Sequence, residues 1–459
     1  MSGRTLFDKI WDAHTVLRRE DGLCLLYIDR HYFHEGSFHA FNRLAERGLS
    51  IRRPDLTFGF GDHYAPTHGR RAEDVADPEI RGIISTFERN VAAHHLTAFR
   101  LADPEQGIVH VAAPELGLTL PGMTVVCGDS HTSSHGALGA LAFGIGASEV
   151  AHVFATQTIW QAKPRQMRIL FTGRLPPGVG AKDMILALIA RIGTGGAIGH
   201  AIEFAGEAVR ALPVEGRLTL CNMAIEAGAR TGMVAPDEVT FAWIAGRRYA
   251  PPVPDPRWRE LFSDADATFD AEVTIDATSL APMATWGTSP EEAAPITGRV
   301  PRPSDAPDAA RAAAWRRSLE YMGLQGGEAF ADIPLDLVFL GSCTNARLPD
   351  LREAAEVLKG RRVAVPMLVS PGSETVRRQA EAEGLDRIFL EAGAEWRHAG
   401  CSLCAAMNGD VVGPRRRCAS TSNRNFPGRQ GREARTHLVS PRTAAASAVA
   451  GRLIPAEAL

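Results

Sequence analysis

Short apolar runs alternate with amphipathic segments in the C-terminal third of the chain, and this alternation most limits the folds open to it. Leu337–Leu340 and Val363–Val369 read as buried strands, and Pro349–Lys359 and Glu374–Glu383 as helices. We expect a third strand at Arg387–Leu390. Because strands that alternate with helices pair in parallel, the sequence predicts an α/β fold with helices covering a parallel sheet.

The loop after the first of these strands predicts a binding site, since ligands collect beyond the carboxyl ends of parallel strands. Cys343 lies in this loop, and Cys401 and Cys404 form a close pair further along the chain. Three thiolates indicate a soft metal. Cys418 could close a tetrahedral zinc site as a fourth ligand. An iron-sulfur cluster on three cysteines would instead leave one iron open, and the spacing alone does not separate the two.

The length of 459 residues exceeds what one hydrophobic core usually serves, so several domains are expected. Two Pro-rich stretches, 251–256 and 295–307, resemble linkers, and the composition changes near Lys163. The sequence therefore predicts three α/β domains, at 1–165, 166–295 and 296–459.

Composition excludes several classes of protein. The formal net charge of -3 gives no field that would attract nucleic acid or an anionic membrane. Seven thinly spread cysteines do not make a disulfide framework. The N-terminus carries early charges, and the most apolar run, 136–147, is shorter than the roughly 20 residues of a membrane span. We expect a soluble cytoplasmic protein.

Segments spread over nearly the whole chain carry a resemblance to one family. They are 29–31, 106–110, 120–123, 127–132, 141–146, 221–226, 234–238, 285–288, 341–345 and 418–431. The most specific is the last, which contains Ser422-Asn423-Arg424-Asn425-Phe426 and Gly428-Arg429-Gln430-Gly431. The chain resembles the aconitase superfamily, and within it the large subunits of 3-isopropylmalate dehydratases. The resemblance implies three α/β domains around a 4Fe-4S cluster, without the swivelling fourth domain of single-chain aconitases.

The resemblance also implies roles for individual residues. The cluster ligands correspond to Cys343, Cys401 and Cys404, which leaves Cys418 to packing. The catalytic residues correspond to Asp62, His63, His110, Asp129, Ser130, His131 and Glu226. The substrate-binding residues correspond to Asn222, Asn423, Arg424 and Arg429, and residues 221–228 can be helical, which would place Asn222 and Glu226 on one face.

The implied reaction interconverts 2-isopropylmalate and 3-isopropylmalate by dehydration and rehydration through 2-isopropylmaleate, in leucine biosynthesis. One iron without a protein ligand would bind the substrate hydroxyl and a carboxylate. A separate small subunit would supply the missing domain and the base, so the chain is expected to act as the large subunit of a heterodimer.

The sequence departs from the family's pattern in three places: at His34–Phe41, around Asp62-His63 within 58–68, and at Ala102–Glu105. These changes leave open a paralogue that acts on another 2-substituted malate, such as a benzyl- or phosphonomethyl-substituted one. Two other classes of function are alternatives. An RNA-binding role is not favoured without a fourth domain or positive potential. A zinc-stabilised scaffold would need Cys418 as a ligand.

Overall fold

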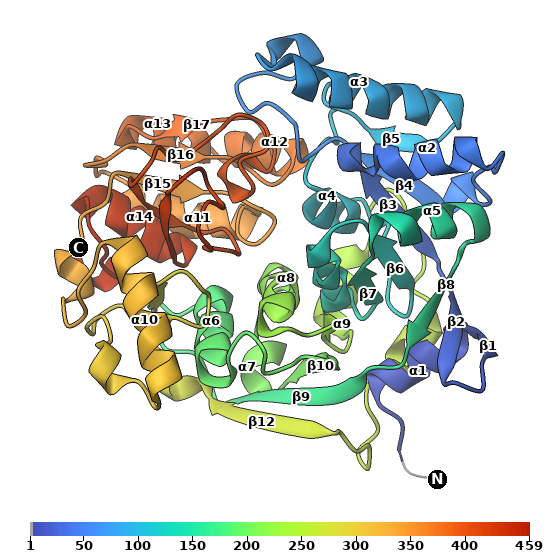
Figure 1. Ribbon diagram of the computed structural model, residues 1–459, viewed down its shortest axis with the longest axis horizontal. Coiled ribbons are helices and arrows are strands. Elements are labelled where there is room, and N and C mark those ends of the chain that lie inside the picture. Colours follow the sequence, from blue (N-terminus) through green and yellow to red (C-terminus); the bar gives the residue numbers. More distant parts are fainter. Residues whose placement is uncertain (1–2) are drawn as a thin grey trace. The chain divides into compact units, whose positions relative to one another are not determined.

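The computed structural model describes residues 3–459, which form two compact units (Figure 1). Each unit is built from separate stretches of the chain. Unit 1 contains the described residues up to Tyr64, Arg71–Arg174 and Gly195–Asp276, and unit 2 contains Ala65–Arg70, Leu175–Thr194 and Ala277–Leu459. The three-domain division at 165 and 295 stays a prediction. Across the described residues, no helix has the length and apolar character needed to cross a bilayer.

A five-stranded parallel sheet forms the centre of the N-terminal part of unit 1, in the order β5-β4-β3-β6-β7. Its strands are β3 (Arg30–His34), β4 (Thr57–Phe60), β5 (Thr97–Phe99), β6 (Thr124–Cys127) and β7 (Leu141–Gly144). The central strands are buried over most of their length because both faces of the sheet are covered. On one face Phe33 packs with Phe41, Phe87 and Phe154, and on the other Tyr32 packs near Phe60.

The helices of this part of the unit supply those two cores. The first core uses α1 (Leu6–His14), α2 (Phe38–Glu46), α3 (Pro78–Ala93) and α5 (Ala147–Thr156), and the second uses α4 (Val109–Glu115). A three-stranded antiparallel sheet contains β1 (Thr15–Arg18), β2 (Leu23–Tyr27) and β8 (Thr158–Ala162).

A second parallel sheet of unit 1 has the order β11-β10-β9-β12. It contains β9 (Arg165–Thr172), β10 (His200–Ala205), β11 (Thr231–Met233) and β12 (Ala271–Asp276), with α7 (Glu207–Arg210), α8 (Val214–Met223) and α9 (Glu238–Ile244) in the same stretch. Asp237 caps α9 and binds Arg217 with both carboxylate oxygens, each at 2.7 Å. Arg217 is fully buried, so this pair fixes α9 to α8.

Unit 2 is organised around a parallel sheet in the order β17-β16-β15-β18-β19. Its strands are β15 (Leu337–Leu340), β16 (Met367–Val369), β17 (Glu395–Trp396), β18 (Arg417–Ser420) and β19 (Arg435–Leu438). The helices are α6 (Ala181–Ile192), α10 (Ala309–Met322), α11 (Leu348–Leu358), α12 (Glu374–Ala382), α13 (Leu385–Ala392) and α14 (Pro441–Ala450), and β13 (Met283–Thr285) pairs with β14 (Ala293–Pro295). In Figure 1, α11 and α14 lie side by side against this sheet.

These elements confirm the predicted α/β class with parallel sheets, and the positions of β15, α11 and α12 match the expectation. The predicted strand at Arg387–Leu390 is wrong, because these residues lie inside α13. Leu385, Phe389 and Ala392 are the buried residues of that helix, at the i, i+4, i+7 spacing of an amphipathic helix. A short apolar run does not distinguish the two structures by itself.

Candidate active site

Polar side chains gather in unit 1 beyond the carboxyl ends of three neighbouring strands. His34 ends β3 and Glu35 follows it, Asp62 and His63 follow β4, and Asp129 follows β6. Since these strands are parallel and adjacent, their ends lie at one edge of the sheet.

His63 lies between two carboxylates. Its Nδ1 is 2.5 Å from Asp62 Oδ1, and its Nε2 is 3.3 Å from Asp129 Oδ2. Asp62 is fully buried and also accepts the backbone N–H of Val109 at 2.9 Å. Burial alone would lower the pKa of His63, but Asp62 and Asp129 raise it well above the usual 6.5. His63 is therefore an imidazolium at neutral pH, and its ring can give up a proton.

Asp129 collects hydrogen bonds from several sides. Its Oδ1 accepts from the ring of His110 at 2.7 Å and from the backbone N–H of His131 at 2.7 Å. Burial would raise the pKa of Asp129, but the hydrogen bonds from His110, His131 and His63 lower it well below 3.8. Asp129 is thus a fixed anion that orients three histidines.

His131 connects this group to a second carboxylate. Its Nε2 is 2.9 Å from Glu226 Oε1, and both side chains are largely buried. Ser130 is half-buried and opens the 3-10 helix η4 (Ser130–Leu138), for which Asp129 is the N-cap. The structure therefore brings Asp62, His63, Asp129, His131 and Glu226 into one hydrogen-bonded group, and their catalytic roles stay a prediction.

Asn222 differs in position from the other predicted residues of unit 1. It lies near the end of α8 and is fully buried, and its amide donates to Ser134 Oγ at 2.9 Å. Glu226 lies in the 3-10 helix η5 (Ala224–Ala227), so the helical geometry changes between the two residues. Asn222 therefore stabilises η4 through its hydrogen bond to Ser134, and its substrate-binding role stays a prediction.

Two members of the group were not singled out from the sequence. Glu35 is fully buried and accepts the backbone N–H groups of His63 at 3.2 Å and Tyr64 at 3.4 Å. Burial and the neighbouring charge of Asp62 raise the pKa of Glu35 to about 7. The ring of His34 stacks on that of His63 with 4.2 Å between centroids, and burial together with the charge of His63 lowers the pKa of His34 to about 4.

The ligand atoms of His34, Glu35, Asp62 and His63 lie within 4.8 Å of one another. No other group of three or more His, Cys, Asp or Glu side chains among residues 3–459 is as compact. Asp62 and Glu35 already accept hydrogen bonds from ring or backbone N–H groups, which meets their need for partners. The arrangement suits a shared proton better than a cation.

The predicted metal ligands lie in unit 2, on loops that follow strands of its sheet. Cys343 comes after β15, Cys401 and Cys404 come after β17, and Asn423 comes after β18. All three cysteines are buried, with 5 to 6% of their surface exposed. Asn423 donates to Cys343 Sγ at 3.5 Å and accepts from Cys404 Sγ at 3.6 Å, so its amide links the two thiols.

The backbone at these cysteines is strained. Ser342, directly before Cys343, has a φ of 80°, and Ser402, between Cys401 and Cys404, has a φ of 45°. Such conformations cost a residue other than glycine about 1 kcal/mol or more and occur mostly at functional sites. The Ser342 hydroxyl lies 3.1 Å from Cys404 Sγ, which shows how closely the two loops approach.

Buried charged side chains hold both loops in place. Arg347 donates to the backbone carbonyls of Cys343 at 2.6 Å and Thr344 at 2.7 Å. Asp410 accepts from Ser402 Oγ at 2.7 Å. These contacts stabilise the loops that carry the three cysteines, and thiols are soft donors of the kind that hold a metal group.

Cys418 occupies a different environment from the other three. It lies within β18, is fully buried among Leu337, Phe339 and Leu403, and directs its thiol to the carbonyl of Ala419. Burial raises the pKa of the Cys418 thiol well above its usual range, which disfavours the thiolate that a metal requires.

The position of Cys418 also bears on the zinc alternative. A structural zinc site needs four donors, and Cys418 directs its thiol to a backbone carbonyl within β18. The donor set of Cys343, Cys401 and Cys404 therefore fits an iron-sulfur group on three cysteines better than a four-cysteine zinc site.

The remaining predicted residues flank Asn423. Arg424 and Arg429 are both half-buried, and the Arg429 guanidinium lies over the ring of Phe426 at 5.6 Å. Their carboxylate-binding roles stay a prediction.

Lys182, a fully buried residue of α6, was not singled out from the sequence. Its ammonium donates to the backbone carbonyls of Thr421, at 2.9 Å, and Ser422. Burial lowers its pKa to about 7. These bonds fix the segment that carries Asn423 and Arg424.

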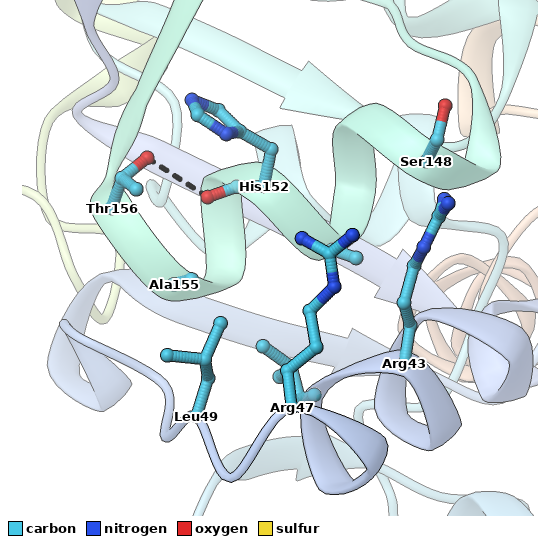
Figure 2. A pocket seen from close by; sticks show the side chains of 9 residues that line it. Arg43, Arg47, Leu49, Ser148, His152, Ala155 and Thr156 are labelled. Atoms are coloured by element: carbon cyan, nitrogen blue, oxygen red, sulfur yellow. Dashed lines mark hydrogen bonds between the residues drawn. The ribbon is translucent and has the colours of Figure 1, made fainter.

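A separate cavity of about 310 Å³ lies between α2 and α5 (Figure 2). Arg43, Arg47, Ser148 and His152 contribute to its lining, and none of the predicted site residues does. This cavity is distinct from the polar group at the strand ends.

Comparison with known proteins identifies a relationship over almost the full length. The model of the aconitase family (aconitate hydratase) matches residues 8–451. The crystal structure of Thermococcus kodakaraensis aconitase X in its holo-form is similar, with a TM-score of 0.47 and 14% sequence identity over 87% of this chain and 84% of that chain.

Proposed function

The chain belongs to the aconitase family, and from this premise we propose that it is the large subunit of a 3-isopropylmalate dehydratase. The proposed reaction interconverts 2-isopropylmalate and 3-isopropylmalate through 2-isopropylmaleate in leucine biosynthesis. Members of the family are hydro-lyases and isomerases. The observation that carries the proposal is the set of three buried cysteines on strained loops at the strand ends of unit 2.

Cys343, Cys401 and Cys404 would hold a 4Fe-4S cluster, and Asn423 would accompany two of its ligands. When bound, such a cluster on three cysteines supplies one iron with a free coordination position, which acts as a Lewis acid toward a hydroxyl or carboxylate oxygen. Arg424 and Arg429 would bind the carboxylates of the substrate, because a guanidinium matches a carboxylate with two parallel hydrogen bonds.

His63 would donate the proton that lets hydroxide leave as water. The imidazolium carries protons on both ring nitrogens, and its Nε2 faces Asp129 rather than the core. Asp62 keeps the ring oriented through Nδ1. Loss of the proton from Nε2 leaves a neutral ring still bound to Asp62, and in the reverse hydration Nε2 takes a proton back from the water that adds to the substrate.

The base that removes the proton from carbon would come from a separate small subunit. This part of the proposal rests on the family relationship. A cytoplasmic heterodimer acting on a soluble hydroxy-diacid follows from it.

A second candidate is a paralogue that isomerises another 2-substituted malate. The segment that departs from the family's pattern, His34–Phe41, forms the end of β3, the 3-10 helix η1 (Glu35–Ser37) and the start of α2. The altered residues of this segment, Gly36–His39, directly follow His34 and Glu35, which keep the family's pattern. His34 stacks on His63 and Glu35 accepts the His63 N–H, so the altered residues begin beside the proposed acid. A change there can alter which substrate side chain the enzyme accepts.

One experiment tests both candidates. The chain is co-expressed with its small subunit, purified without oxygen, and assayed with 2-isopropylmalate, benzylmalate and phosphonomethylmalate by the absorbance of the unsaturated intermediate. Preference for 2-isopropylmalate supports the first candidate, and preference for another malate supports the second. Absence of turnover with all three by a cluster-loaded heterodimer contradicts both.

A further inference from the structure

A row of buried hydrogen bonds leads from Asp129 into the core of unit 1. His110 Nε2 binds Asp129 Oδ1 at 2.7 Å, and His110 Nδ1 lies 3.1 Å from His135 Nε2. His135 Nδ1 lies 2.8 Å from Thr119 Oγ1, and this hydroxyl lies 2.9 Å from the hydroxyl of Tyr32. His135, Thr119 and Tyr32 are completely buried, so bulk water does not compete for these bonds.

The chemistry at one end of the row fixes the direction of every bond. Asp129 is ionised and can only accept, so His110 must carry a proton on Nε2. In a neutral His110 the other nitrogen, Nδ1, then accepts, which requires a proton on His135 Nε2. His135 Nδ1 accepts in turn from the Thr119 hydroxyl, and Thr119 accepts from Tyr32. All donors point toward Asp129, and bonds aligned in this way reinforce one another.

We propose that His135 is a positioning residue that holds His110 in the Nε2–H tautomer, so that His110 presents a hydrogen-bond donor to Asp129. Thr119 and Tyr32 set the tautomer of His135 by the same means. The assignment of tautomers stands on this geometry together with an ionised Asp129 and a neutral His110. Its importance for catalysis rests on the proposed function, in which Asp129 orients the proton donor His63.

The packing around His135 agrees with a fixed orientation. Its ring lies in η4, with 5.2 Å between its centroid and that of Tyr32 and 5.3 Å to that of His110. A ring enclosed between two aromatic neighbours cannot turn over without disturbing both. Both ring nitrogens of His135 are engaged, Nε2 with His110 and Nδ1 with Thr119, so the ring links two hydrogen bonds of fixed direction.

The test observes the tautomer directly, without substrate or metal. The intact chain is labelled with 15N-histidine, and long-range 1H–15N NMR correlations report which ring nitrogen of His110 carries the proton. We expect the Nε2–H pattern in the unsubstituted protein. In His135→Phe, which removes the donor to Nδ1, one neutral hydrogen bond is lost, so the tautomer ratio should shift by roughly fivefold to tenfold.

Matched variants separate positioning from general damage. His135→Gln can still donate an amide N–H and should restore the Nε2–H pattern. Thr119→Val preserves shape and should shift the His110 signals in the same direction as His135→Phe, which keeps the test decisive if His135→Phe fails to fold. His152→Phe changes an exposed histidine outside the row and should leave the His110 signals unchanged.

An Nδ1–H pattern for His110 in the unsubstituted protein, or a His110 tautomer ratio that is unchanged in both His135→Phe and Thr119→Val, would overturn the proposal. Inactivity toward every malate together with the expected tautomer would instead overturn the proposed function and leave the positioning role intact. In an active heterodimer, His135→Phe should lower kcat more than it raises KM, and His135→Gln should recover kcat.

Discussion

Replacing Cys418 and Cys401 by alanine in separate variants distinguishes a three-cysteine cluster from a four-cysteine zinc site. Both residues are buried cysteines outside any disulfide, so each change removes a sulfur atom from the interior. The structure places Cys418 inside β18 and Cys401 on a loop beside Cys404. The two variants should therefore resemble each other in stability and differ in metal content.

The cost of Cys418→Ala follows from its surroundings. The residue is 0% exposed, and its strand is hydrogen-bonded on both sides, to β15 and β19, so the backbone cannot collapse into the space left. Removing one buried atom of about methyl size typically costs about 1 kcal/mol. The thiol's bond to the Ala419 carbonyl is a weak one and adds little. We expect a loss of about 1 kcal/mol in the free energy of unfolding, measured by urea titration of the metal-free chain.

Metal analysis supplies the decisive comparison. After anaerobic reconstitution, Cys418→Ala should bind as much iron and sulfide as the unsubstituted chain, whereas Cys401→Ala should lose most of both. Zinc is measured in the same samples. Equal loss of metal from the two variants, or stoichiometric zinc without sulfide, would show that Cys418 is a ligand and that the proposed dehydration lacks its Lewis acid.

Three further predictions concern stability. Burial lowers the pKa of His63 and Asp62 raises it, and the result lies well above 6.5. The charged ring therefore stabilises the folded protein fully below pH 6.5, and this stabilisation is lost as the pH rises through the raised pKa. Unfolding curves of His63→Gln should lack that alkaline loss. Burial raises the pKa of Glu35 from 4.5 to about 7, so ionising this carboxyl destabilises the folded protein. The destabilisation is absent below pH 4.5, grows between 4.5 and about 7, and is complete above that. Glu35→Gln should therefore gain stability relative to the unsubstituted protein over that window. Arg217→Met removes a fully buried guanidinium that donates to Asp237 and to the carbonyls of Arg210 and Leu212, and should cost about 2 kcal/mol in urea unfolding, while Arg257→Met, in an exposed pair, should have no measurable effect.

Each of these has a clear contrary outcome. An unchanged alkaline slope in His63→Gln would mean that the neighbouring carboxylates do not hold the ring as a cation. A flat difference curve for Glu35→Gln would mean that this carboxyl ionises normally despite its burial. Similar losses for the two arginine variants would contradict the buried geometry of Arg217.

The sequence predicted the elements whose pattern is local. β15 is a short apolar run that ends in a loop, and α11 begins with Pro349 in its first turn, so both positions follow from neighbouring residues. The helix α13 was not predicted, because its short apolar run could equally have formed the next strand of the sheet. That strand is β17, which follows α13 in the chain and pairs with β16. Strand partners decide such cases, and they are distant in sequence.

The same distinction applies to the site. The rule that ligands lie beyond parallel strand ends placed Cys343 correctly at the end of β15, and the resemblance indicated Asp62, His63 and Asp129. Lys182 could not be found this way, since its partner Thr421 is 239 residues away and a lysine in a helix is ordinarily exposed. Likewise, nothing in the sequence distinguishes His135 among the 15 histidines, because its hydrogen-bond partners are known only from the structure.

The buried charges of unit 1 restrict how its sequence can vary. Burial and the charge of Asp62 raise the pKa of Glu35, and burial together with the charge of His63 lowers the pKa of His34, so the protonation states of these neighbouring groups depend on one another. A substitution at His34 or Glu35 therefore changes the pKa of His63 even when it leaves the fold intact. The residues that diverge, Gly36–His39, directly follow this pair and form η1 and the start of α2. If His63 is the proton donor, a change there that shifts His34 or Glu35 would alter the acid as well as the neighbouring surface.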